Sequence, residues 1–199
     1  EKLKKKLRAK NKLIFAASYD KTISMCKYDN DMITLSKTFT GHTNDVNCVL
    51  INKYNNMRGT INQIVSGSYD QTIRVWDIVS GNCIHTVISN QPIGVIAWWK
   101  QGQYLIESGA GLGRFNIHIR QWNQHNYTSK EHGTIIKTLK GHKSLVNALI
   151  VDESNDQLLS CSSDQTIRLW DLKNGLQIKQ FVGHTNIVFG LCQVNKYVF

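Results

Sequence analysis

The stretch SYDQTIRVWDIVSGNCIHTV, residues Ser68–Val87, occurs a second time in almost the same letters as SSDQTIRLWDLKNGLQIKQF, residues Ser162–Phe181. The two copies lie 94 positions apart, so that Trp76 in the first corresponds to Trp170 in the second. Repetition over this length indicates that one structural unit has been copied along the chain. The nature of the copied unit decides the fold.

A shorter motif accompanies the long repeat. It occurs three times, as FTGHTNDVNCVLI from Phe39, LKGHKSLVNALIV from Leu139 and FVGHTNIVFGLCQ from Phe181. The tryptophans Trp76, Trp122 and Trp170 are spaced by 46 and 48 residues. These intervals predict a repeating unit of roughly 40–45 residues with short insertions, which is the size of a propeller blade.

Each unit has the texture of short β-strands. Apolar residues lie on both faces in VNCVLI and VNALIV, as expected for strands covered on each side. A strand, a tight turn and a return strand are predicted in QIVSGS, YDQ and TIRVWDI, and a fourth strand in GNCIHTV. Four short antiparallel strands form a small sheet that cannot bury both faces alone, so neighbouring sheets must pack against it.

These residues resemble the WD-repeat β-propeller family, whose blades carry Gly-His near their start and Trp-Asp near their end. The matching pairs are Gly41-His42 with Trp76-Asp77, Gly141-His142 with Trp170-Asp171, and Gly183-His184 at the start of a further unit. The resemblance covers nearly everything from about Leu13 onward. It implies an all-β β-propeller of WD-repeat type with about four blades in this chain, as part of a larger propeller of about seven blades.

We divide the chain into a basic N-terminal segment and a series of blades. The expected bounds are 1–12 for the segment and 13–40 (partial), 41–88, 89–140 (degenerate), 141–182 and 183–199 (partial) for the blades. The first unit has Cys26 where the tryptophan belongs. The third has Ser89-Asn90 in place of Gly-His and Trp122-Asn123 in place of Trp-Asp.

The two ends of the series complement each other. The first unit lacks its opening strand, and 183–199 should form one or two opening strands of another blade. The ends could join to close a four-bladed ring, or the arc could continue in a longer chain or be covered by a second chain. We favour the longer chain.

One polar pattern recurs in two blades and resembles a Ser–His–Asp triad. The two sets are His42, Ser66, Asp70 and Trp76, and His142, Ser160, Asp164 and Trp170. The family resemblance implies a structural role instead, in which these side chains form a buried hydrogen-bond chain. Ser68 and Ser162 are alternative candidates for the serine of that chain. Two copies in separate blades do not suit a hydrolase, which needs one activated serine in a cleft.

The resemblance also implies that the turns around Gly-His and the turn aspartates emerge on one face that docks proteins or peptides. The residues expected to bind a partner there are Tyr19, Asn44, Asp45, Tyr69, Lys143, Ser144, Ser163, Thr185 and Asn186. Tyr19 and Tyr69 precede the turn aspartates of adjacent blades and should stand side by side as aromatic anchors. The alternative is that each tyrosine packs on its own turn.

Charge and cysteine content restrict the remaining possibilities. The net charge is +10, and the segment 1–12 alone has seven Lys or Arg residues against one Glu. That segment could contact nucleic acid, contact an acidic partner, or serve as a solvated linker. Five scattered cysteines without a CxxC pair argue against a disulfide framework or a metal site and suit a cytoplasmic or nuclear location. No apolar run is long enough to span a membrane.

The glycine-rich stretch SGAGLGRF, residues 108–115, hints at a phosphate-binding loop. A strand pattern follows it rather than a helix, so a lengthened hairpin turn is the better interpretation and no cofactor is expected.

Taken together, the repeat and the duplicated polar sets predict a non-catalytic scaffold for protein–protein interactions within a multiprotein complex. The alternatives are an RNA-associated or ribonucleoprotein assembly factor that uses the basic segment, and a Ser-His-Asp hydrolase.

Overall fold

The structure is a computed structural model of the 199-residue chain, and it describes residues 12–29, 32–54, 62–111, 113, 115–124 and 126–193. All regular elements within these ranges are β-strands. The basic segment predicted at 1–12 lies outside the described residues except for Lys12. Over the same ranges, the chain forms no helix of the length and apolarity that a membrane crossing requires.

The described strands, β1 to β15, form four antiparallel sheets. The first sheet has the order β1 (Lys12–Ala17), β2 (Ile23–Asp29), β3 (Met32–Phe39). The second consists of β4 (Val46–Ile51), β5 (Gln63–Ser68), β6 (Thr72–Asp77) and β7 (Cys83–Ile88). The third consists of β8 (Ile93–Trp99), β9 (Tyr104–Gly109), β10 (Ile117–Gln121) and β11 (Ile135–Leu139). The fourth consists of β12 (Val146–Asp152), β13 (Gln157–Ser162), β14 (Ile167–Asp171) and β15 (Leu176–Phe181).

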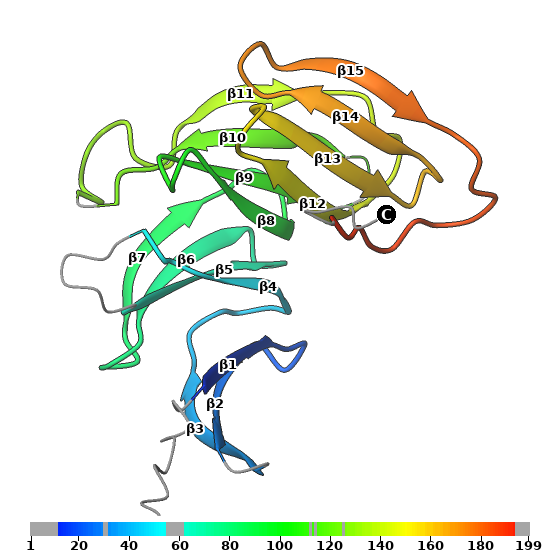
Figure 1. Ribbon diagram of the computed structural model, residues 1–199. Coiled ribbons are helices and arrows are strands. Elements are labelled where there is room, and N and C mark those ends of the chain that lie inside the picture. Colours follow the sequence, from blue (N-terminus) through cyan, green and yellow to red (C-terminus); the bar gives the residue numbers. More distant parts are fainter. Residues whose placement is uncertain are drawn as a thin grey trace, which may run out of the picture.

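The four sheets follow one another along an arc, and each forms one blade (Figure 1). The innermost strands β4, β8 and β12 contact their neighbours from blade to blade, and β1 contacts β4. The first blade has three strands where each of the other blades has four. This arrangement confirms the predicted all-β propeller architecture, with about four blades in the chain.

The chain after β15 differs from the sequence-based expectation. One or two opening strands are predicted within 183–199, but residues 182–193 contain no strand, and 194–199 lie outside the described residues. The N–H of Val188 donates to the carbonyl of Ser162 at 3.2 Å, as the N–H of Val46 at the start of β4 donates to Ser18 at 3.0 Å. The segment thus begins where an inner strand would begin. It forms no strand here because a strand needs a second strand to bond its backbone groups.

The hydrophobic core lies between neighbouring blades. Between the second and third blades, Val65 and Val75 pack with Ile96 and Leu105, and all four are at most 4 % exposed. Leu159 corresponds to Val65 in the long repeat but is only partly buried. The difference arises because no described sheet covers that face of the fourth blade. Blade-to-blade stacking therefore supplies the burial that a single sheet cannot.

Candidate functional site

The structure brings the first predicted polar set together inside the second blade. His42 Nδ1 lies 2.7 Å from Asp70 Oδ2, and His42 Nε2 lies 2.7 Å from Ser66 Oγ. The indole N–H of Trp76 donates to the same Ser66 oxygen at 2.8 Å. Because indole only donates and a carboxylate only accepts, the chain runs from Trp76 through Ser66 and His42 to Asp70.

The second predicted set has the same geometry in the fourth blade. His142 Nδ1 lies 2.8 Å from Asp164 Oδ2, His142 Nε2 lies 2.7 Å from Ser160 Oγ, and Trp170 donates to Ser160 at 2.8 Å. The repeat in sequence is therefore also a repeat in hydrogen bonding.

The electrostatics of this chain are set by burial. Burial lowers the pKa of His42 and outweighs the opposing effect of Asp70, so the imidazole is neutral near pH 7. Burial disfavours the charged Asp70 carboxylate, but the hydrogen bonds it accepts, first from the Thr72 hydroxyl, hold its pKa at about 2. A neutral imidazole with Nδ1–H donated to an ionised carboxylate is the state that satisfies every member.

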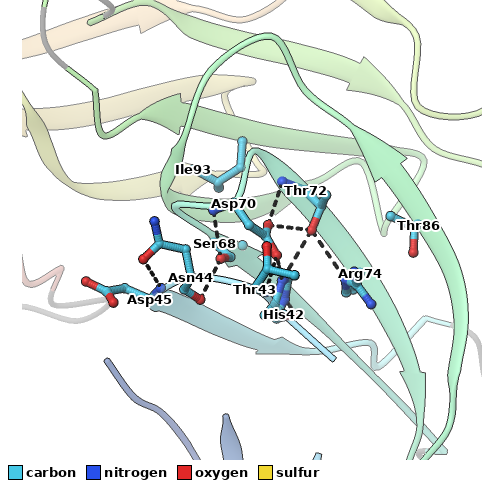
Figure 2. Close-up of polar contacts among 12 residues, drawn as sticks. His42, Thr43, Asn44, Asp45, Ser68, Asp70, Thr72, Arg74, Thr86 and Ile93 are labelled. Atoms are coloured by element: carbon cyan, nitrogen blue, oxygen red, sulfur yellow. Dashed lines mark hydrogen bonds and ion pairs between the residues drawn. The ribbon is translucent and has the colours of Figure 1, made fainter. Parts of the chain in front are cut away.

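The Asp70 carboxylate also fastens the turn to the loop before β4. It accepts the N–H of Thr43 at 3.0 Å and both the N–H and the hydroxyl of Thr72, at 2.9 and 2.6 Å (Figure 2). Ser68 takes part in the turn rather than in the indole–imidazole chain, since its hydroxyl donates to Asn44 O and accepts the N–H of Asp70. Ser66, not its substitute Ser68, is thus the serine of the network.

This geometry does not suit nucleophilic catalysis. Ser66 and Ser160 are 0 % exposed, and each oxygen already accepts an indole N–H. A serine nucleophile must reach a substrate carbonyl and have donors ready for the oxyanion. The arrangement can lock a sheet but cannot receive a substrate.

The third blade departs from the sequence-based alignment. Its strand register places Arg120 opposite Leu105, as Trp76 lies opposite Ile64, so Arg120 and not Trp122 occupies the tryptophan position. Trp122 follows β10 instead of lying within it. The expected equivalence of Trp122 is wrong because register, which spacing alone does not reveal, differs by two residues.

The same register corrects the start of the third blade. Counting from the first residue of each inner strand, Ile93 in β8 and Val46 in β4, Ser89 corresponds to His42. The pair Ser89-Asn90 therefore replaces His and the residue after it, not Gly-His. Glu107 then occupies the position of Ser66.

A buried ion pair replaces the neutral chain in this blade. Arg120 Nε and Nη2 donate to Glu107 Oε1 at 3.0 and 2.8 Å, and Nη2 also donates to Ser89 Oγ at 3.1 Å. Nη1 donates to the carbonyl of Gly133 at 2.6 Å. Burial raises the pKa of Glu107, while Arg120 acts in the opposite direction. Since the guanidinium keeps its charge, the carboxylate is needed in its charged form.

Tyr19 and Tyr69 both line one hollow on the face that carries the turn aspartates, which we call the turn face. Its volume is about 230 Å³, and its lining consists of Tyr19, Asn47, Tyr69, Gly94, Ala110, Leu145, Val146 and Asn147. Tyr19 is 76 % exposed, and the Tyr69 hydroxyl donates to the carbonyl of Ala110 in the third blade at 2.7 Å. Tyr69 therefore bridges to the next blade instead of packing only on its own turn.

The other residues predicted to bind a partner lie on the flanking loops and do not line this hollow. They are Asn44, Asp45, Lys143, Ser144, Ser163, Thr185 and Asn186, all exposed or partly exposed. The lining residues that sequence reasoning missed come from the starts of β4, β8 and β12, except Ala110, which follows β9. A signal existed: the VN pair that opens both VNCVLI and VNALIV puts asparagine at an otherwise apolar position.

Two further expectations concern ligands. The stretch 108–115 begins with the last two residues of β9 and leads into β10, which pairs antiparallel with β9, so its described residues belong to a hairpin. Residues 112 and 114 lie outside the described residues. In the described ranges no three His, Cys, Asp or Glu side chains gather as a metal site would require. The cysteines Cys26, Cys48, Cys83, Cys161 and Cys192 are unpaired.

Comparison with known proteins identifies the repeating unit. The family described as "WD domain, G-beta repeat" matches residues 33–77 and 133–171. An uncharacterized WD repeat-containing protein of Schizosaccharomyces pombe is 26% identical over 172 residues, which are 84% of this chain and 44% of that protein. The ribosome biogenesis protein ytm1 of Emericella nidulans is 34% identical over 116 residues, which are 56% of this chain and 23% of that protein.

A solved structure shows the same architecture. The WD40 β-propeller domain of Doa1 superposes with a TM-score of 0.66 at 20% identity, covering 87% of this chain and 51% of that one. This chain spans less than half the length of the two relatives named above. Two stretches of the chain match WD40 repeats, and its fold is that of a WD40 β-propeller.

Proposed function

We propose that the chain is a non-catalytic scaffold within a multiprotein complex and that it binds other proteins or peptides on its turn face. The observation that carries this proposal is the hollow that Tyr19 and Tyr69 line together with the starts of three inner strands. WD-repeat propellers are in general interaction folds without catalytic activity, and the buried serines agree with that class.

The two tyrosines have the properties of interface anchors. Tyr69 is 37 % exposed and its hydroxyl is already bonded to Ala110, so its ring is held in place before a partner arrives. Tyr19, on the adjacent blade, presents most of its ring to solvent. Aromatic side chains that lose little entropy on binding contribute most to interfaces.

The proposal includes what covers the two ends of the series of blades and where the protein is located. Among the described residues, the first and last blades each have a face that no neighbouring blade covers, and we propose that the remainder of the same propeller or a second chain covers it. The proposed blade bounds are 13–40, 41–88, 89–140, 141–182 and 183–199. Unpaired cysteines favour a cytoplasmic or nuclear protein.

A second candidate function is supported by one relative. The Emericella nidulans protein is described as a ribosome biogenesis protein, and the segment 1–12 of this chain is strongly basic. A role in ribonucleoprotein assembly would make binding to generic RNA depend steeply on salt, with a slope that falls when the lysines of this segment are replaced by glutamine. Binding that is absent at low salt would contradict this candidate.

The test of the scaffold function compares Tyr69→Ala with Val79→Ala. Val79 is 81 % exposed in the turn at the opposite end of the same sheet, so its truncation should be neutral. Removing an anchor ring should weaken capture of the partners that the tagged wild-type chain retains by roughly 30-fold. Circular dichroism checks that both variants fold. A folded Tyr69→Ala chain that retains every wild-type partner overturns the proposal.

A further inference from the structure

Two asparagines each bond the start of a blade's inner strand to the chain segment that follows that blade. Asn47 lies at the bulge that follows the first residue of β4, and its side-chain amide donates to the carbonyl of Ile93, the first residue of β8, at 2.7 Å. Asn147 lies at the same bulge in β12 and donates to the carbonyl of Val188 at 2.8 Å. A carboxamide on one blade thus bonds the carbonyl of the first residue of the next blade or, for Asn147, of the corresponding residue Val188 in the segment after β15.

The third blade lacks this side chain. Its inner strand β8 has the same bulge after Ile93, but the bulged residue is Gly94. The carbonyl that corresponds to those of Ile93 and Val188 belongs to Val146, the first residue of β12. Because glycine has no side chain, no carboxamide from β8 reaches this carbonyl. We call the bond from the asparagine side-chain amide to the main-chain carbonyl, seen at Asn47 and Asn147, the latch. It is missing between the third and fourth blades.

The hollow lies where the latch is missing. Gly94, Ala110, Val146 and the two tyrosines all line it. None of the eight lining residues carries a charged side chain. The hollow thus contains the Val146 carbonyl position, to which β8 offers no side-chain donor. The small residues Gly94 and Ala110 also line it, together with the aromatic rings of Tyr19 and Tyr69 from two blades.

We propose that this hollow takes the carboxamide side chain of an asparagine or glutamine presented by a partner peptide, in place of the latch that Gly94 omits. The inference rests on the proposed function, since it names the kind of segment that the turn face binds. The molecule shows twice that a carboxamide bonds the equivalent carbonyl, at Ile93 and at Val188. An uncharged lining favours a neutral donor over a Lys or Arg side chain, because a buried charge without a partner is costly.

Selection from a phage-displayed library of random linear dodecapeptides on the 199-residue chain supplies the probe. Enriched peptides should share an asparagine or glutamine at one aligned position. The strongest peptide is then synthesised twice, once as selected and once with that residue replaced by leucine, which has nearly the shape of asparagine. Loss of a bonded carboxamide should lower affinity for the wild-type chain about tenfold or more.

Two variants of the protein complete the test. Gly94→Asn should restore the latch inside the molecule and abolish binding of the selected peptide while leaving the melting temperature unchanged or raised. Gly94→Ala is the matched control, because it adds the Cβ without the amide and should change affinity less than about threefold. A Cβ at Gly94 would lie 3.3 Å from the Ala110 Cβ, so both variants need the same small adjustment.

The outcomes separate this inference from the proposed function. Peptides that require Tyr69 but bind equally well after leucine replacement would show that the carboxamide assignment is wrong while the docking face stands. Equal binding by folded Gly94→Asn, or a library that yields no enriched peptide, also overturns the assignment. If Gly94→Asn does not fold, the leucine comparison on the wild-type chain decides. Peptide binding that ignores Tyr69→Ala contradicts the docking face itself.

Discussion

The second and third blades have the same strand register and the same bulge in their inner strand, yet they hold their polar interiors together with different chemistry. In the second blade Trp76, Ser66 and His42 are neutral, and the chain ends at the charged Asp70 in the turn, with Arg74 beside it over the Trp76 ring. In the third, Glu107 and Arg120 form an ion pair that is 0 % and 3 % exposed. The blade shape is therefore set by apolar alternation and turns, and several polar networks suit it if their members complement one another.

The contacts on the outer side of the blades repeat this contrast. Lys37 and Lys137 occupy the same register position in the first and third blades and donate to main-chain carbonyls of the following blade. The corresponding residue of the second blade is His85, whose ring stacks on Tyr127 at 5.2 Å between centroids. Tyr127 belongs to the loop between β10 and β11 and donates to Gln63 at 2.6 Å. The long loop of the third blade replaces the lysine contact with a ring contact.

Breaking the ion pair tests the contrast most strongly. Arg120→Met leaves the Glu107 carboxylate buried without its partner, and we expect the free energy of unfolding to fall by about 3–5 kcal/mol. Denaturant titration of the variant and the wild-type chain measures the change.

The matched control is the double variant Glu107→Leu with Arg120→Met, which removes both charges. Replacing a buried pair with apolar residues of similar size is close to neutral, so the double variant should regain most of the lost stability. If the double variant is as unstable as Arg120→Met, the loss comes from packing and the ion pair does not replace the neutral chain as described.

The neutral network should be less costly to break. His142→Ala removes the acceptor of Ser160 and a donor of Asp164, and we expect a loss of about 2–3 kcal/mol. Thermal melting compared with Lys143→Ala measures it, because the Lys143 side chain is exposed and only its main-chain N–H bonds Asp164. Equal melting temperatures for the two variants would contradict a stabilising role of the network.

The sequence predicts the polar networks of the second and fourth blades but not that of the third. In the second and fourth blades the Gly-His and Trp-Asp pairs both recur, although Trp76 follows Gly41 by 35 positions and Trp170 follows Gly141 by 29. The structure places His42 and His142 in equivalent networks. In the third blade the nearest tryptophan, Trp122, misled the alignment because Arg120 has no resemblance to the residue it replaces. When an ion pair replaces the neutral network, the Gly-His and Trp-Asp motif is lost from the sequence. Only the pairing of β9 with β10 shows that Arg120 occupies the tryptophan position.

The hollow could be predicted in part for a similar reason. Tyr19 and Tyr69 were recognisable because each precedes a turn aspartate. Gly94 was not, since its meaning depends on a carbonyl of another blade, 52 residues away in sequence at Val146. Contacts between blades depend on the stacking geometry, which a repeat motif within one blade does not specify.

The smallest expected effect concerns pH and the loop of the third blade. His132 Nδ1 accepts the N–H of Asn123 at 3.0 Å, and burial, with a smaller effect of His85, lowers its pKa to about 4. The unfolded chain has this group near pKa 6.5, so between these values the unfolded state binds more protons. The contribution of His132 is complete above about pH 6.5 and is lost as pH falls toward 4.

His132→Asn tests this titration, because the asparagine oxygen can accept the Asn123 N–H but takes up no proton. The variant starts from a lower melting temperature, since the His132 ring contact with Trp122 at 4.4 Å is lost, so only the change with pH is compared. Between pH 7 and pH 5 the wild-type chain should lose about 2–4 °C more than the variant, which corresponds to about 1 kcal/mol. His42 and His142 keep their lowered pKa values in both proteins and therefore cancel in the difference. Equal losses in the two proteins would mean that protonation of His132 does not contribute to the acid sensitivity of the fold.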